Sequence, residues 1–290
     1  MKIGIIGAEN SHAESFSKAL NLADKNGLFR YDNMRVVKVF GEGDSAKILA
    51  EKVGARAVYS LADFDDCDSI MITSRRGSVH YKQALRFIEK GIPLFIDKPI
   101  TVSIDEAKSL IESARRNNSL ICGGSACKYA PDVLKLAEVV SGLRREKKLI
   151  SASLNFNIFM NIEYDGFYFY AAHLIEIADT IFGKGLQSVL AKKINNAVVV
   201  VADYEDVAVS MHYTEGVFES SCTLYAKSGI VFQKLDISTI FDEELKIYAD
   251  MLHQKKQPVS SEDLIYPVKV AEAIRQSYTS GIEMFMKDFL

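Results

Sequence analysis

Short apolar runs alternate with amphipathic stretches over about the first 120 residues of the chain. Five runs are almost continuously apolar, which is typical of strands buried on both faces of a parallel sheet. They are IGIIG (3–7), MRVVKVF (34–40), SIMIT (69–73), IPLFI (92–96) and SLICG (119–123). Because these strands alternate with helical segments, the pattern predicts right-handed βαβ crossovers and a doubly wound α/β sheet.

The sequence predicts where several of the helices between these strands begin and end. Two capping boxes, each a serine followed three residues later by a glutamate, are predicted at Ser11–Glu14 and Ser103–Glu106. Gly27 is the expected stop of the first helix, and Gly91 closes the helix that starts near His80.

The regular alternation of strand-like and helical segments ends at about residue 123. Helices are expected at 131–141 and about 171–182, with an apolar stretch at 149–159 between them. Four strand-like runs then follow one another near 187–193, 197–202, 206–213 and 217–225. Consecutive strands with short turns favour antiparallel pairing, so the second half is predicted to be an α+β unit with an open, mainly antiparallel sheet. The tail from Glu262 is helical in pattern beyond Pro267.

Length and composition fit this picture of two domains, predicted at 1–123 and 124–290. With 48% hydrophobic residues and 5 prolines, the chain is expected to be ordered and globular. Its 35 basic and 38 acidic residues are well mixed along the chain and leave a formal charge of -3. This pattern does not predict a basic surface that would bind nucleic acid. Small-molecule partners are therefore expected.

Neither a secretory signal nor a membrane span is visible, so a cytoplasmic location is expected. The longest aliphatic run, AVVVVA at 197–202, is far below the roughly 20 residues that a membrane-spanning helix needs. The four cysteines, without a CxxC pair, suggest buried thiols in a reducing compartment. The five histidines show neither HxH nor HxxxH spacing, and no metal is predicted.

The turn after the first apolar run, GAENSH at 7–12, stands where a dinucleotide-binding protein is expected to show three glycines. Gly7 supplies the tight turn, whereas Glu9 and His12 replace the other two glycines. The helix that follows offers free N–H groups and a partial positive charge, which suit a pyrophosphate. A plain strand-turn-helix explains this short fragment equally well.

The segment HYKQALRFIEKGIPLFIDKP at 80–99 carries a more specific signal. It resembles the Gfo/Idh/MocA family of oxidoreductases, in which a histidine, a glycine and an acid-Lys-Pro tripeptide share these offsets. His80, Gly91 and Asp97–Pro99 match them. The tail at 254–281 is similar to the closing helix of the family, which packs back on the first domain.

Two further segments extend the resemblance into the second half. GSACKYAP at 124–131 is similar to the segment at the domain junction of the family, with Lys128 in place of arginine. FYFYAAHLIEIADTIFG at 167–183 is similar to a helix of the second domain, where His173, Glu176 and Gly183 match.

The resemblance implies a Rossmann domain that binds NAD or NADP and a second domain that covers the nicotinamide. The expected activity is hydride transfer between that cofactor and a sugar, polyol or related hydroxyl compound. Lys98 would polarise the reacting oxygen and His173 would act as general acid and base, with Tyr170 and Lys128 also touching substrate. Association as a homodimer or homotetramer through the second sheet is likewise expected. The residues expected at the cofactor are Gly7, Glu9, Asn10, Ser11, His12, Glu42, Ser74, Arg75, Asp97 and Lys98.

Lys98, His173 and His80 can each also be interpreted as purely structural residues. Lys98 with Pro99 is also consistent with a simple turn, and His173 with a helix cap, a core histidine or a surface pair with Glu176. His80 is expected to have a structural role near the start of its helix.

The sequence also departs from the family pattern at several positions. Two arrangements of Glu9 stay open: its carboxylate occupies the helix N-terminus and repels phosphate, or its side chain turns away and admits a pyrophosphate. Gly41 stands where a ribose-binding acid is expected; Glu42 and Asp44 follow it and favour NAD over NADP, although Asp44 is equally suited to capping the next helix.

Two more departures affect the substrate side. Arg76-Gly77 replaces the usual Pro-Asn after the fourth strand, where Arg75 and Arg76 either clamp an anion or are solvated. Phe169 replaces an aspartate four residues before the histidine, with Asp165, Tyr168 and Tyr170 nearby. Two alternative functions therefore stay open: a cofactor-less binding or regulatory protein, and NAD-assisted glycoside cleavage without net oxidation.

Overall fold

The computed structural model describes residues 1–160 and 162–289, which form two compact units. Unit 1 comprises Met1–Gly124 and Phe241–Leu264, and unit 2 comprises Ser125–Ile240 and Ile265–Leu290. The sequence-based division at residues 123 and 124 assigned the segment 241–264 to the second domain, whereas this segment packs with the first unit.

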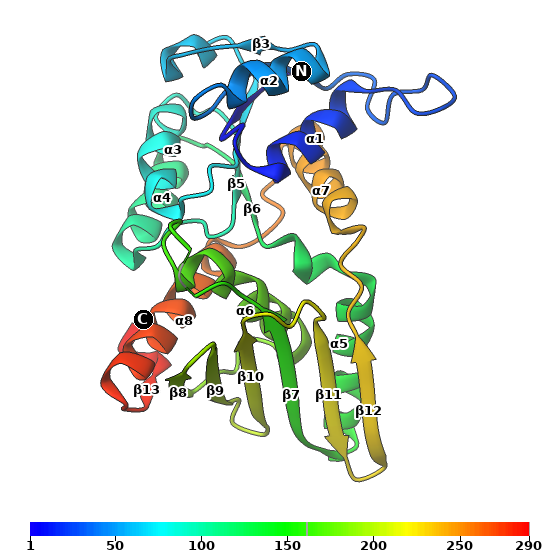
Figure 1. Ribbon diagram of the computed structural model, residues 1–290, viewed down its shortest axis with the longest axis vertical. Helices are drawn as coiled ribbons and strands as arrows, with labels where there is room; N and C mark the ends of the chain where they lie inside the picture. Colours follow the sequence, from blue (N-terminus) through cyan, green and yellow to red (C-terminus); the bar gives the residue numbers. More distant parts are fainter. Residues whose placement is uncertain (161, 290) are drawn as a thin grey trace. The chain divides into compact units, whose positions relative to one another are not determined.

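Unit 1 is built on a parallel sheet in which six strands are described, in the order β3-β2-β1-β4-β5-β6. Figure 1 labels β3, β5 and β6 of this sheet. The strand order reverses between β1 and β4, as in a doubly wound fold. Five strands coincide with the five apolar runs; β3 has only two residues and has no pattern of its own. The strands are β1 (Lys2–Ile6), β2 (Arg35–Phe40), β3 (Arg56–Ala57), β4 (Ser69–Ile72), β5 (Leu94–Asp97) and β6 (Ile121–Gly124).

Helices cover both faces of this sheet because successive strand residues point to opposite sides. Ile5 packs in a core with Phe16 and Tyr248, whereas Ile6 packs in a second core with Phe87. The first core is formed with α1, α2 and α7, and the second with α3 and α4. The helices are α1 (Ser11–Asn21), α2 (Ser45–Val53), α3 (His80–Ile88), α4 (Ile104–Arg116) and α7 (Ile240–Gln254). Each fully buried large side chain stabilises the fold by about 1.5–3 kcal/mol.

The beginning of α1 differs from the expected capping box. Asn10 is the N-cap, and its side chain accepts a hydrogen bond from the His12 backbone N–H at 3.1 Å. Glu14 instead pairs with Lys18 and Lys52, so the predicted box at Ser11–Glu14 was wrong. The helix also ends at Asn21, six residues before the expected stop at Gly27.

The other predicted helix ends of unit 1 are closer to the structure. Ser103 caps α4 and accepts a hydrogen bond from the Glu106 N–H at 3.4 Å. Gly91 follows α3 with a positive φ of 69°. Helix α7 was not expected from the sequence.

Unit 2 contains a mixed sheet in the order β12-β11-β7-β10-β9-β8-β13. Only the pair β7–β10 is parallel among these described strands, so the expected open and mainly antiparallel sheet is confirmed. The strands are β7 (Leu149–Asn157), β8 (Ser188–Ile194), β9 (Ala197–Asp203), β10 (Ala208–Thr214), β11 (Ser221–Ala226), β12 (Gly229–Lys234) and β13 (Met284–Phe285). The pattern did not predict β12 or β13.

Two helices of unit 2, α5 (Pro131–Arg145) and α6 (Phe167–Phe182), contact one face of this sheet. Alternate strand residues such as Leu154 and Tyr213 are fully buried. The third helix, α8 (Ser261–Ser280), contains Pro267, whereas the pattern predicted a helix only beyond this proline.

Large apolar side chains are exposed along the strands of unit 2. They are Ile150, Leu190, Ile194, Val201, Tyr225, Ile230, Val231 and Phe232. Phe232 on β12, for example, is 66% exposed. Leu190, Val201 and Tyr225 alternate with buried strand residues, and Phe232 shares the face of Tyr225, so all four lie on the open face of the sheet. The sequence predicts an oligomer contact on this open face, which stays a prediction.

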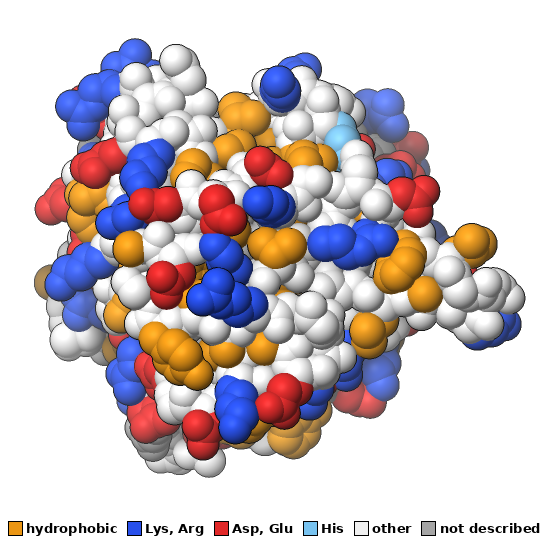
Figure 2. Space-filling model, turned by 90° about the horizontal axis from the view of Figure 1, so that it is seen from above, with side chains coloured by type: hydrophobic (Ala, Val, Ile, Leu, Met, Phe, Trp, Pro, Cys, Tyr) orange, Lys and Arg blue, Asp and Glu red, His pale blue; other side chains and the backbone are white. Residues whose placement is uncertain are grey.

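Basic and acidic side chains are interspersed on the face shown in Figure 2, in agreement with the mixed charge pattern of the sequence. None of the helices formed by residues 1–160 and 162–289 combines the length and the apolar character needed to cross a bilayer.

Candidate active site

The turn between β1 and α1 lies at the carboxyl end of the parallel sheet, where the strand order reverses. Gly7 has a φ of +100°, and a Cβ at this position would lie 2.2 Å from the Ser74 backbone nitrogen. The N–H groups of Gly7 and Ala8 both donate to the Phe40 carbonyl, at 2.8 and 3.0 Å. The turn is therefore held between the ends of β2 and β4, and only glycine fits at position 7.

Glu9 turns its side chain toward the end of β2. Its Oε2 accepts a hydrogen bond from the Glu42 backbone N–H at 3.3 Å. The cap of α1 is supplied by Asn10, so the Glu9 carboxylate does not cap the helix. Of the two arrangements left open by the sequence, the structure shows the one in which Glu9 turns away.

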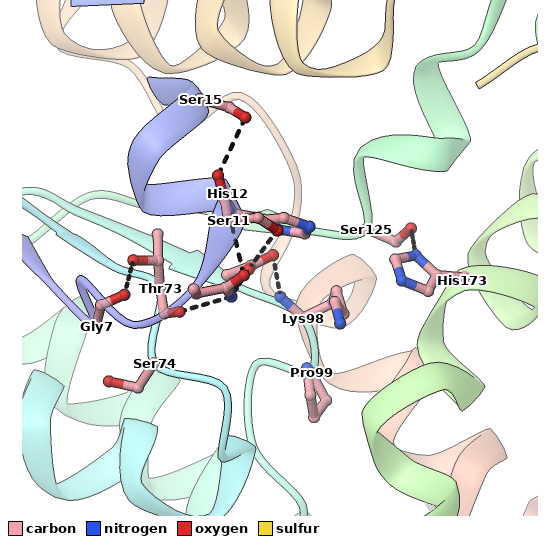
Figure 3. A network of polar contacts seen from close by, with 12 residues as sticks. Gly7, Ser11, His12, Ser15, Thr73, Ser74, Lys98, Pro99, Ser125 and His173 are labelled. Atoms are coloured by element: carbon pink, nitrogen blue, oxygen red, sulfur yellow. Dashed lines mark hydrogen bonds and ion pairs between the residues drawn. The ribbon is translucent and has the colours of Figure 1, made fainter. Parts of the chain in front are cut away.

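Asp97, at the end of β5, joins the turn to the segment that carries Lys98. Its Oδ2 lies 2.7 Å from His12 Nδ1 and 3.3 Å from Asn10 Nδ2, and its Oδ1 accepts from the Lys98 N–H at 2.8 Å (Figure 3). Asn10 also donates to the Thr73 carbonyl at 2.8 Å. Burial tends to raise the pKa of Asp97, but the charges and hydrogen bonds of His12 and Lys98 together outweigh it and hold the pKa below its usual value.

The turn around Lys98 is fixed by a buried histidine. Lys98 is 4% exposed, and its peptide bond to Pro99 is cis. His80 is fully buried, with Nδ1 2.8 Å from the Pro99 carbonyl oxygen and Nε2 2.8 Å from that of Ser74. His80 thus links the ends of β4 and β5, as its expected structural role requires.

Close packing also accounts for Gly77, which stands where the family usually has asparagine. A Cβ at Gly77 would lie 2.5 Å from Pro99 Cγ. The neighbouring Arg75 and Arg76 are half-buried, so neither is a fully solvated surface charge. Their suggested role in binding an anion stays a prediction.

His173 lies on α6 in unit 2, where three residues from two other segments fix its ring. Its Nδ1 is 2.8 Å from Ser125 Oγ and 3.4 Å from Cys127 Sγ. The Phe156 ring of β7 stacks on the imidazole, with 5.0 Å between ring centroids and an interplanar angle of 26°. Ser125 Oγ also accepts a hydrogen bond from the Cys127 N–H at 3.2 Å. The ring is thus held at its Nδ1 side.

Glu176, one turn after His173, is buried in an ion pair. Its Oε2 lies 2.7 Å from Lys128 Nζ, and its Oε1 accepts from the Ser125 N–H at 2.7 Å. The alternative in which Glu176 forms a surface pair with His173 was therefore wrong. The role of Lys128 at the substrate stays a prediction, but its ammonium is engaged with Glu176.

The remaining candidates have less distinctive surroundings. Glu42 is exposed, and Ser74 is buried with its Oγ 3.0 Å from Gln83 Oε1. Asp44 stands at the N-cap of α2 but makes no side-chain capping bond, so capping does not explain this residue. Ser11 is the first residue of α1, and its carbonyl accepts from Ser15.

Aromatic residues replace the missing aspartate near His173. The Phe169 and Tyr170 rings meet edge to face at 4.8 Å, and the Tyr170 ring lies 6.3 Å from the His173 ring. Tyr168 donates to Glu272. Asp165 has a positive φ of 60° and immediately precedes Gly166, the residue before α6.

Sequence reasoning missed several partners of these residues. The missed partners are Ser125, Cys127 and Phe156 around His173, and Thr73 beside Asn10; Phe156 and Thr73 had no signal of their own. Most of these contacts join segments more than 40 residues apart, as between Cys127 and His173. Only the residues Gly124–Pro131, already singled out as a motif, pointed toward Ser125 and Cys127.

Comparison with known proteins gives this geometry a context. Residues 1–124 match the family model described as an oxidoreductase family with an NAD-binding Rossmann fold, Gfo/Idh/MocA. An uncharacterized oxidoreductase of Streptococcus pneumoniae is 22% identical over 100 residues, 34% of this chain and 27% of the relative. Inositol 2-dehydrogenase 3 of Saccharopolyspora erythraea is 29% identical over 103 residues, 34% of this chain and 30% of that protein. The matches thus span less than a third of either curated relative.

Solved structures resemble the chain over nearly its whole length. GenD2 from gentamicin A biosynthesis, solved in complex with NAD, has a TM-score of 0.83 and 14% identity over 98% of this chain and 96% of its own. A myo-inositol dehydrogenase from Corynebacterium glutamicum has a TM-score of 0.79 and 17% identity over 98% of both chains. At these identities the likeness shows the fold. Residues 1–124 thus match the Gfo/Idh/MocA model of oxidoreductases with an NAD-binding Rossmann fold, and the whole chain shares the two-domain fold of these solved structures.

Proposed function

We propose that the protein is an NAD(P)-dependent oxidoreductase that acts on a sugar, a polyol or a related hydroxyl compound. The observation that carries this proposal is the turn after β1. It is held at the carboxyl edge of the sheet by Gly7 and Ala8, and the carboxylate of Glu9 is turned toward β2. This arrangement supports dinucleotide binding despite the two replaced glycines.

The residues present fit a dinucleotide in two respects. The absent side chain of Gly7 allows the backbone to turn against Ser74, and Asn10 caps α1 without adding a negative charge to its N-terminus. In the proposal, the residues from Gly7 to His12 hold the pyrophosphate. When bound, the cofactor supplies the acceptor or donor of a hydride.

Lys98 and His173 are proposed to handle the oxygen and the proton of the substrate. The Lys98 ammonium donates a hydrogen bond to the reacting oxygen and stabilises negative charge that develops there. As the carbinol carbon loses its hydride, the hydroxyl proton passes to His173, and the same proton returns when a carbonyl is reduced. An imidazole suits this exchange because its ordinary pKa is about 6.5.

Contacts seen in each unit support these assignments. The Lys98 backbone is fixed by the hydrogen bond to Asp97 and by the buried His80 behind Pro99. The His173 ring is fixed at Nδ1 by Ser125 and on one face by Phe156, and these contacts orient the imidazole that the proposal assigns to the proton transfer.

The test is a screen of sugars and polyols with NAD and NADP, followed by absorbance of the reduced nicotinamide. With an active substrate, Lys98→Ala and His173→Ala should each lower turnover by about 10²–10⁴-fold. Lys82→Ala and His212→Ala are matched controls, because Lys82 is exposed on α3 and His212 contacts Ser210 on the second sheet. Unchanged turnover in both test variants would reject the assignment.

Calorimetric titration with NAD, NADH, NADP and NADPH separates this proposal from its rival, a cofactor-less binding protein. Binding of at least one of the four supports the oxidoreductase. Absence of binding by all four at about millimolar concentration, a free energy weaker than about -4 kcal/mol, favours the rival.

A further inference from the structure

We infer that Glu9 supplies the carboxylate that binds the adenosine ribose of the cofactor, so that the protein prefers NAD(H) to NADP(H). The inference rests on the proposed dinucleotide binding. In Rossmann domains an acid about 20 residues after the glycine turn, close to the end of the second strand, accepts from the ribose 2′-hydroxyl. Here that acid comes from the glycine turn itself.

The usual position for the acid is sterically closed. Gly41 follows β2, and a Cβ built there would lie 2.8 Å from Ala8 Cβ and 2.9 Å from the Ala8 nitrogen. Ala8 has little freedom to move away, since its N–H donates to the Phe40 carbonyl at 3.0 Å. Any side chain at position 41 therefore collides with the backbone of the turn.

Glu9 brings a carboxylate to the same end of β2 from the other side. Its Oε2 lies 3.3 Å from the backbone nitrogen of Glu42, the residue directly after Gly41. This bond and the pinned backbone of Ala8 hold the Glu9 side chain, which is half-buried, whereas Glu42 and Asp44 are exposed. Among the three acids at this edge, Glu9 is thus the one held by a contact across the two strands.

The chemistry of this carboxylate fits an unphosphorylated ribose. An ionised carboxylate accepts at about four lone-pair sites, and the bond from Glu42 uses one of them. The ribose hydroxyls can donate to the remaining sites in charge-assisted hydrogen bonds. A 2′-phosphate brings acceptors and negative charge instead, so it is repelled. The replacement of the second glycine by Glu9 and the loss of the acid at position 41 then have one explanation.

The experiment compares the dissociation constants for NADH and NADPH in wild type and in Glu9→Gln. The chain contains no tryptophan, so the emission of the reduced nicotinamide can be followed directly. Glu9→Gln keeps the shape of the side chain and removes its charge. We expect wild type to bind NADH more tightly, and the NADPH/NADH ratio of dissociation constants to fall by about tenfold in the variant, the loss of one charge-assisted bond.

Asp44→Asn is the matched control, because it removes a neighbouring charge from an exposed side chain at the same edge. It should leave the ratio within about twofold of wild type. Glu42→Gln tests the rival acid that the sequence placed at the cofactor. An unchanged ratio in Glu9→Gln, a fall in Glu42→Gln as large as that in Glu9→Gln, or a wild type that prefers NADPH would overturn the inference and leave the oxidoreductase proposal intact. A wild type that binds neither dinucleotide would overturn both.

Discussion

Replacement of Gly7 by alanine tests whether the β1–α1 turn depends on the missing side chain. The new Cβ would lie 2.2 Å from the Ser74 nitrogen and 2.5 Å from both the Ser74 Cα and the Thr73 carbonyl carbon, all of them backbone atoms. Relief requires β1 and β4 to move apart, which costs about 1–3 kcal/mol as in other overpacked sites. The positive φ of +100° adds strain of about 1–3 kcal/mol for a residue with a Cβ. The free energy of unfolding should therefore fall by about 2–6 kcal/mol.

Gly27→Ala is the matched control for this change. Gly27 also has a positive φ, of 77°, but a Cβ there meets no atom within 4 Å. The control variant carries the backbone strain without the steric overlap, so the difference between the two variants isolates the overlap at Ser74.

Urea unfolding followed by far-ultraviolet circular dichroism measures both variants, and titration with NADH measures binding by the folded protein. Gly7→Ala should be less stable than Gly27→Ala by at least about 1 kcal/mol and should bind NADH more weakly, because the turn shifts. Equal stability of the two variants, within about 0.5 kcal/mol, would refute the steric account of the turn.

Three further predictions concern charge and surface. His12→Ala should lower the free energy of unfolding by about 1–3 kcal/mol because the buried Asp97 carboxyl loses its contact with His12 Nδ1, and a double-mutant cycle with Asp97→Asn should recover part of the loss; additive losses would contradict the pairing. Hydrogen bonding to Arg275 lowers the pKa of Glu272 from 4.5 to about 2. The ionised Glu272 side chain therefore stabilises the fold above about pH 4.5, and this stabilisation is lost as the pH falls toward 2. In urea unfolding, the loss of stability in Glu272→Gln relative to wild type should shrink over that range, and a loss that does not change with pH would contradict the prediction. Phe232→Glu should leave monomer stability within about 0.5 kcal/mol but weaken self-association in sedimentation velocity, unless wild type is already monomeric.

Burial decided which parts of the fold were visible in the sequence. The strands β1, β4 and β5 are buried on both faces, and their apolar runs predicted them within a few residues. In contrast, β3 is two residues long and β12 is almost entirely exposed, so neither carries a pattern that distinguishes a strand from a loop. Their positions depend on the neighbours with which they pair.

The site was predictable as a set of positions rather than as a set of contacts. The resemblance to the family singled out Lys98 and His173, but the residues that hold them come from distant segments. Asp97 meets His12 across 85 residues, and His173 meets Ser125 across 48. Such pairs depend on which strand ends become neighbours in the folded sheets, and no local periodicity encodes that. The same reason explains why the cap of α1 was assigned to Ser11 although Asn10, held by Thr73, performs it.

The closed space beside Gly41 also restricts how this chain can change over generations. An acid at position 41 would collide with Ala8, so a single substitution there is harmful while the present turn is retained. In the role proposed for Glu9, loss of its carboxylate is costly as long as position 41 carries no acid. The collision at position 41 is with Ala8 and not with Glu9, so a glycine at position 9 would not make room for that acid. A return to the common fingerprint therefore requires the backbone of the turn to shift in addition to the two substitutions, and a lineage with the present turn is expected to keep it.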